Sequence, residues 1–166
     1  MAACRTLGIH AYRGNEQGWI YRMEGSDRRN FFKRGLRFLD TYIDLFGPQT
    51  YPIPDGEAGI PVNIMGSRQL KPVSTSLNRL EKMRLRRILN AMTHAAVNGE
   101  IYHLWWHPHN FGVQLDENMD FLRKILGHFR LLQKSHHFES MAMEQLAADI
   151  LENAKNGSKH EVIGSM

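Results

Sequence analysis

Apolar residues recur every three or four positions over three segments of the chain, which predicts three amphipathic helices. The apolar stripes are Phe32, Leu36, Leu39, Ile43 and Phe46 in the first segment, Leu77, Leu80, Leu85, Ile88, Leu89 and Met92 in the second, and Leu122, Ile125, Leu126, Phe129 and Leu132 in the third. Polar caps and breakers bound these segments. The caps are Ser26 or Asp27, then Ser74 or Ser76, then Asp116, and the stops are Gly47-Pro48 for the first helix and Asn98-Gly99 for the second.

Short runs of alternating or β-branched residues lie between these helices and predict strands. The better candidates are residues 5–12 and 101–106; residues 62–65 and 138–141 are shorter ones, and residues 144–153 predict a last helix. Residues 49–72 form a long loop rich in proline and glycine. Strands that alternate with helices are typical of an α/β fold with a parallel or mostly parallel sheet and helices on its outside.

Two side chains follow directly after predicted strands, where proteins of this architecture place their chemistry. His107 follows the strand at 101–106, and Arg13 follows the strand at 5–12. An imidazole at this position can act as a general acid or base, bind a metal, or serve as an inert polar cap. Arg13 can orient a carboxylate, although an ordinary surface arginine is the simpler interpretation.

Side chains alternate along a strand, so His103, Trp105 and His107 share one face of the segment at 101–106. His103 and His107 have the H-x-x-x-H spacing, but on a strand they lie about 13 Å apart at roughly 3.3 Å per residue, too far for one ion. We therefore interpret His103 as a core histidine.

Composition narrows the class of protein. The chain has 166 residues, 42% of them hydrophobic, with one cysteine and a net charge of +4. That is enough for one folded domain, and it excludes an internal disulfide. No apolar run is long enough to span a bilayer and no signal peptide is seen, so we expect a cytoplasmic protein unless the chain lacks its own start. The cations between Arg79 and Arg87 predict a solvated outer helix face, and we expect no nucleic-acid partner.

The segment Gly-Glu-Ile-Tyr-His-Leu-Trp-Trp-His-Pro-His-Asn-Phe-Gly, residues 99–112, resembles the polysaccharide deacetylases (NodB homology, carbohydrate esterase 4) in their C-terminal half. H-A-Y-R-G-N-E-Q-G-W, F-K-R-G-L-R-F-L-D-T-Y-I and V-N-I-M-G-S-R-Q-L-K-P support the resemblance, which covers about residues 8–150. It implies a partial, irregular (β/α) barrel over residues 1–155. The terminal position of residues 156–166 predicts a flexible tail.

The resemblance also implies an activity: metal-dependent hydrolysis of acetyl groups on surface-polysaccharide sugars, with zinc as the expected metal. His107 corresponds to the histidine that protonates the leaving amine, and Arg13 to the arginine that braces the aspartate base, although Gly14-Asn15 replaces the usual Pro-Tyr. The expected substrate-binding residues are Asn15, Trp106, His109 and Asn110.

The segment that carries the aspartate base and the metal ligands in this family is missing from this sequence. It has no Asp-Asp-Gly turn and no H-x-x-x-H motif in an early segment, so we expect it to hold no metal and to be inactive alone. Exposed sheet edges would pair with the missing N-terminal half or with a second copy. The alternative is a non-catalytic protein that binds carbohydrate or a partner chain through the same cleft.

Overall fold

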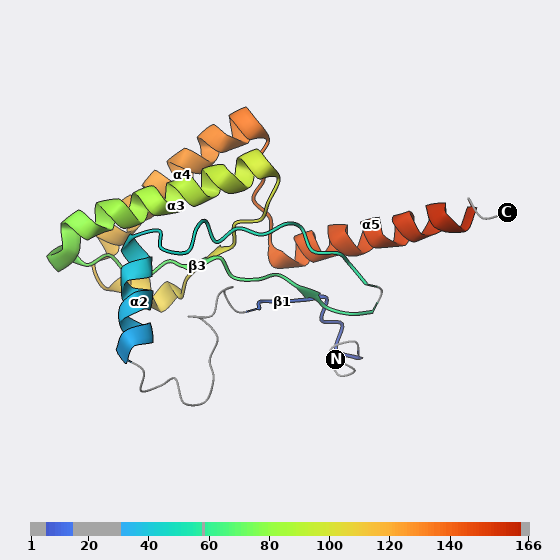
Figure 1. Ribbon diagram of the computed structural model, residues 1–166, viewed down its shortest axis with the longest axis horizontal. Coiled ribbons are helices and arrows are strands. Elements are labelled where there is room, and N and C mark those ends of the chain that lie inside the picture. Colours follow the sequence, from blue (N-terminus) through green and yellow to red (C-terminus); the bar gives the residue numbers. More distant parts are fainter. Residues whose placement is uncertain (1–5, 15–30, 58, 164–166) are drawn as a thin grey trace. The chain divides into compact units, whose positions relative to one another are not determined.

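A computed structural model describes residues 6–14, 31–57 and 59–163 (Figure 1). The helices are α2 (Phe31–Tyr42), α3 (Asn78–Asn98), α4 (Leu115–His136) and α5 (Met143–Ile163), with 3-10 turns η2 (Thr75–Leu77) and η3 (Pro108–Gly112). The strands are β1 (Ala11–Tyr12), β2 (Val62–Asn63), β3 (Arg68–Gln69) and β4 (Leu104–Trp105).

The prediction of a partial (β/α) barrel is wrong. The part of the chain that the structure describes is mostly helical, and its strands are two residues long and form two separate two-stranded sheets, β1 with β2 and β3 with β4. Both pairs are parallel. The predicted strand at 138–141 is irregular backbone instead.

Competing partners shorten the strand predicted at 101–106. Ile101 pairs with Tyr51 in an isolated antiparallel bridge, so it does not join the parallel ladder. At His103 the backbone N–H donates to the Ser67 side-chain oxygen at 2.9 Å rather than to a carbonyl of β3. Only Leu104 and Trp105 remain in register with Arg68 and Gln69. A hydrogen bond to a serine side chain thus takes the place of one backbone–backbone hydrogen bond between the strands.

The chain divides into two compact units, and each is described by itself. The first comprises residues 1–14, 52–65 and 139–166. In it, β1 and β2 are joined by hydrogen bonds from Val62 N to His10 O at 2.8 Å and from Ile64 N to Tyr12 O at 2.9 Å. Helix α5 packs its apolar side on this pair. The buried cluster is Val62, Ile64, Ala147 and Ile150.

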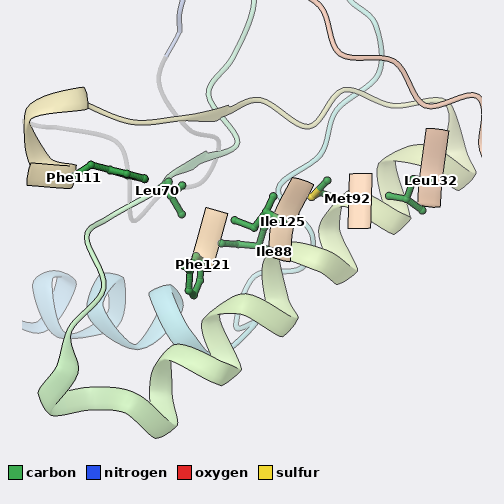
Figure 2. Close-up of a cluster of buried hydrophobic side chains, with 7 residues drawn as sticks. All are labelled: Leu70, Ile88, Met92, Phe111, Phe121, Ile125 and Leu132. Carbon is green, nitrogen blue, oxygen red and sulfur yellow. The ribbon is translucent and has the colours of Figure 1, made fainter. Parts of the chain in front are cut away.

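The second unit comprises residues 15–51 and 66–138 and contains α2, α3, α4, β3 and β4. Helices α3 and α4 lie side by side (Figure 1). Figure 2 shows buried side chains along α3, joined by Leu70, which follows β3, and by Phe111 of η3. They are Leu70, Ile88, Met92, Phe111, Phe121, Ile125 and Leu132. The predicted stripes supply Ile88, Met92, Ile125 and Leu132 of this core, whereas the prediction that Leu126 is buried is wrong, since this residue is 49% exposed.

The observed ends of the helices agree only in part with those that the sequence predicts. Helix α3 ends at Asn98-Gly99 as predicted, because Gly99 takes a left-handed φ of 66° and its N–H bonds to Ala95 O. The predicted caps differ: Leu77 precedes α3 and Gln114 precedes α4, and neither makes a side-chain cap bond. The caps predicted for α2 lie outside the described residues.

Helix α2 does not bury the apolar stripe that the sequence predicts for it. Leu39, Ile43 and Phe46 are exposed, whereas Asp40 and Tyr42 are buried. The helix also ends at Tyr42, not at Phe46. Asp40 faces inward because an arginine on α3 pairs with it, as described below.

Gly127 offers a test of the helical assignment of α4. It lies inside the helix, and a Cβ added there would meet no heavy atom within 4 Å. Because alanine loses less conformational entropy than glycine in a helix, Gly127→Ala should stabilise the protein by roughly 0.5–1 kcal/mol. Urea unfolding followed by circular dichroism measures this. A destabilised variant would contradict the helical, uncrowded position of Gly127.

Candidate functional site

Strand β4 directly precedes the candidate residues Trp106, His107 and His109. Its partner β3 lies parallel to it, and Leu70 N donates to Trp105 O at 2.8 Å, while Ser67 N donates to His103 O at 3.0 Å. Directly beyond the carboxyl end of β4 the backbone is extended at His107 (φ −97°, ψ 121°) and then enters η3 at Pro108. Since Pro108 has no N–H to donate, the ladder cannot continue past this point.

The His107 ring is exposed and contacts two other rings. The Trp105 ring meets it edge-on, with centroids 5.4 Å apart and planes at 86°. The His109 ring stacks on it, also at 5.4 Å, with planes at 23°. The contact between Trp105 and His107 agrees with the predicted alternation of side chains. Two aromatic neighbours restrict the orientation of an imidazole that solvent still reaches.

The Trp106 ring stacks on Phe111, with centroids 5.8 Å apart and planes at 30°. Phe111 is buried in the core, whereas 39% of Trp106 remains exposed. Asn110 is half-buried, and its backbone N–H donates to His107 O at 3.0 Å, closing the first turn of η3. An indole fixed on one side by the core and open to solvent is a suitable surface for stacking a sugar ring.

The structure brings together His107, His109, Asn110 and Trp106 within one short segment. Arg13 follows β1 in the first unit and is exposed there, so the structure does not test whether it lies near His107. Asn15 lies outside the described residues. A pocket shared by Arg13 and His107 therefore stays a prediction.

The metal that the resemblance implies does not fit the residues present. Within residues 6–14, 31–57 and 59–163, no three histidine, cysteine, aspartate or glutamate side chains converge on a point that could hold a metal ion. His107 and His109 stack face to face, and their rings do not converge on one ion. We therefore assign no step of chemistry to a metal held by these residues.

The sequence did not predict a group of buried charged residues that includes Asp40 and Arg68. Asp40 on α2 is fully buried and contacts Arg87 on α3 at 2.8 Å and Arg68 on β3 at 3.8 Å. Arg87 also reaches the exposed Asp44 at 3.2 Å. This group links α2, α3 and β3, and so supports the strand that pairs with β4.

A second buried pair lies near the start of α3. Arg84 contacts Glu81 at 2.5 Å, donates to Lys71 O at 2.7 Å and lies 4.4 Å above the Phe121 ring. Burial raises the pKa of Tyr42, the Glu81 charge raises it further, and Arg84 lowers it.

The expectation that the cations of α3 form a solvated face is therefore wrong for Arg84 and Arg87, which are buried. Helical spacing contained a signal for this: residues 81, 84, 88, 91 and 95 share one side of α3, and Ile88 and Ala95 are in the core.

Comparisons of the chain with protein-family models, with curated proteins and with solved structures found no match. The resemblance to the polysaccharide deacetylases therefore rests on the sequence segments alone. No helix in the described part of the chain combines the length and apolar character needed to cross a membrane.

Proposed function

We propose that the surface formed by Trp106, His107 and His109 binds carbohydrate, and that His107 is the proton-donating imidazole of a polysaccharide deacetylase site. One observation carries the proposal: an exposed imidazole, oriented by Trp105 and His109, lies directly beyond the carboxyl end of a parallel strand, with an exposed indole in the preceding position. The sequence of residues 99–112 supports the same assignment.

In this proposal His107 supplies one step, the donation of a proton to the leaving group. Hydrolysis of an N-acetyl group releases an amine, and this leaving group must receive a proton as the bond to the carbonyl carbon breaks. An imidazole has a suitable pKa for this donation near neutral pH. The base that activates water and the metal ligands would come from residues outside this sequence, such as those of a partner chain.

Binding is tested first, because it needs only this chain. Titration of labelled protein with chitopentaose, followed by NMR, should shift the Trp106 indole N–H and the His107 ring C–H signals. Trp106→Ala should weaken binding about fivefold, since an aromatic stacking contact is worth about 1 kcal/mol. Leu131→Ala, an exposed apolar residue on α4, is the control and should bind as the wild type does. Absence of shifts at both residues would overturn the carbohydrate site.

Catalysis is tested by acetate release from an acetylated oligosaccharide, with the chain mixed with the N-terminal half of a polysaccharide deacetylase. His107→Gln should lower the rate about 10²- to 10⁴-fold, because general acid catalysis contributes about that much. A variant with full activity would exclude His107 as the acid.

A second candidate function is non-catalytic binding of carbohydrate. The exposed Trp106 favours it. In that case oligosaccharide binding depends on Trp106, and no mixture with the missing N-terminal half releases acetate.

A further inference from the structure

Three cations lie on the outer side of α3. Arg79, Lys82 and Arg86 are exposed, and their spacing of three and four residues places them on one side of the helix. At 1.5 Å per residue they extend over about 10 Å of the helix axis. Met83 is the exposed apolar residue among them.

These cations differ from the other arginines of α3 in having no acidic partner among the residues that the structure describes. Arg84 pairs with Glu81, and Arg87 pairs with Asp40 and Asp44. Glu81 is the single acidic residue of α3, and it is buried. In the described part of the chain, no hydrogen bond or ion pair involves the side chains of Arg79, Lys82 or Arg86.

The buried side of α3 fixes where these charges point. Ile88, Ala91 and Ala95 anchor the helix in the core, and the Arg87–Asp40 pair connects it to α2. Three positive charges thus lie in a row on one helix, and no acidic side chain of residues 6–14, 31–57 or 59–163 pairs with them. Such a row attracts a polyanion, and the guanidinium groups match the geometry of carboxylates.

We propose that the outer side of α3, formed by Arg79, Lys82 and Arg86, binds an anionic polysaccharide through its carboxylate groups. The inference rests on the proposed function for the choice of a sugar polymer. It is also favoured over a single-stranded nucleic acid because no phenylalanine, tyrosine or tryptophan accompanies the cations in α3, so bases would find no stacking surface. The cationic row would hold an acidic polymer independently of the stacking surface at Trp106.

The experiment uses fluorescent oligogalacturonate and measures anisotropy at increasing salt. Binding should weaken with a log–log slope of about −2, as three contacts contribute roughly 0.7 each for a single-stranded polyanion. The triple variant Arg79→Gln/Lys82→Gln/Arg86→Gln should bind roughly tenfold more weakly at low salt. The control triple Lys124→Gln/Arg130→Gln/Lys134→Gln changes the net charge equally on α4 and should lose much less affinity.

Chitopentaose titration of the same variants separates this inference from the proposed function. The α3 variant should keep the NMR shifts at Trp106. If chitopentaose gives no shifts while oligogalacturonate binding still depends on α3, the proposed function fails and the α3 site stands. An α3 variant that binds oligogalacturonate as the wild type does, or an α4 control that loses as much, would overturn the α3 site. Tighter binding of single-stranded DNA than of oligogalacturonate at equal salt would replace the polysaccharide with nucleic acid.

Discussion

Asp40→Ala should lower the free energy of unfolding by about 3–5 kcal/mol, because it leaves buried arginine charges without their partner. Asp40 is fully buried, and its carboxylate lies 2.8 Å from Arg87 and 3.8 Å from Arg68. Urea unfolding followed by tryptophan fluorescence reports on this unit, since Trp105 and Trp106 lie in it.

Asp44→Ala is the matched control for this prediction. Asp44 pairs with the same Arg87 at 3.2 Å, but its side chain is 46% exposed. An exposed ion pair is screened by water, so the loss should stay below about 1 kcal/mol. The double variant Asp40→Ala/Arg87→Met should be more stable than Asp40→Ala, because it removes the uncompensated guanidinium. A single Asp40→Ala variant within about 1 kcal/mol of the wild type would show that the pair does not hold α2 on α3.

The second large effect is expected in the core between α3 and α4. Ile125→Ala should destabilise the protein by about 2–5 kcal/mol, since it removes buried methyl groups and leaves a cavity among Ile88, Phe121 and the other core residues shown in Figure 2. Ile125 is 2% exposed. The same urea titration measures the loss.

The neighbouring residue provides an isomeric control. Leu126 carries the same number of carbon atoms, but it is 49% exposed. Leu126→Ala should therefore cost less than about 1 kcal/mol. Equal losses for the two variants would mean that α4 is rotated from the orientation that buries Ile125.

Helices α3 and α4 were predictable because their signal is local. An apolar residue every three or four positions defines one side of a helix wherever the helix packs, and Leu85, Ile88 and Met92 or Ile125 and Leu132 follow this spacing. The end of α3 at Asn98-Gly99 was also predictable, since glycine readily takes the left-handed conformation that Gly99 adopts. The position of His107 directly beyond a strand followed from the apolar run and Pro108.

Strand pairing was not predictable in the same way, because it depends on a partner distant in the sequence. Ile101 pairs with Tyr51, and the Ser67 side chain receives the His103 N–H, so the apolar run forms only two residues of ladder. The barrel predicted from the strand–helix alternation fails for this reason. The site prediction was limited similarly, since Trp105 and Phe111 orient His107 and Trp106 through ring contacts that spacing alone does not give.

The sequence by itself determined which segments become helices α3 and α4, where α3 ends, and which imidazole and indole follow the strand. Only the tertiary structure decided which charged residues are buried. Arg87 and Asp40 are 47 positions apart, and each would be solvated on an isolated helix. They lie in the interior because each neutralises the other when α2 packs on α3. Arg79, Lys82 and Arg86 have no such partner in the described part of the chain and lie at the surface.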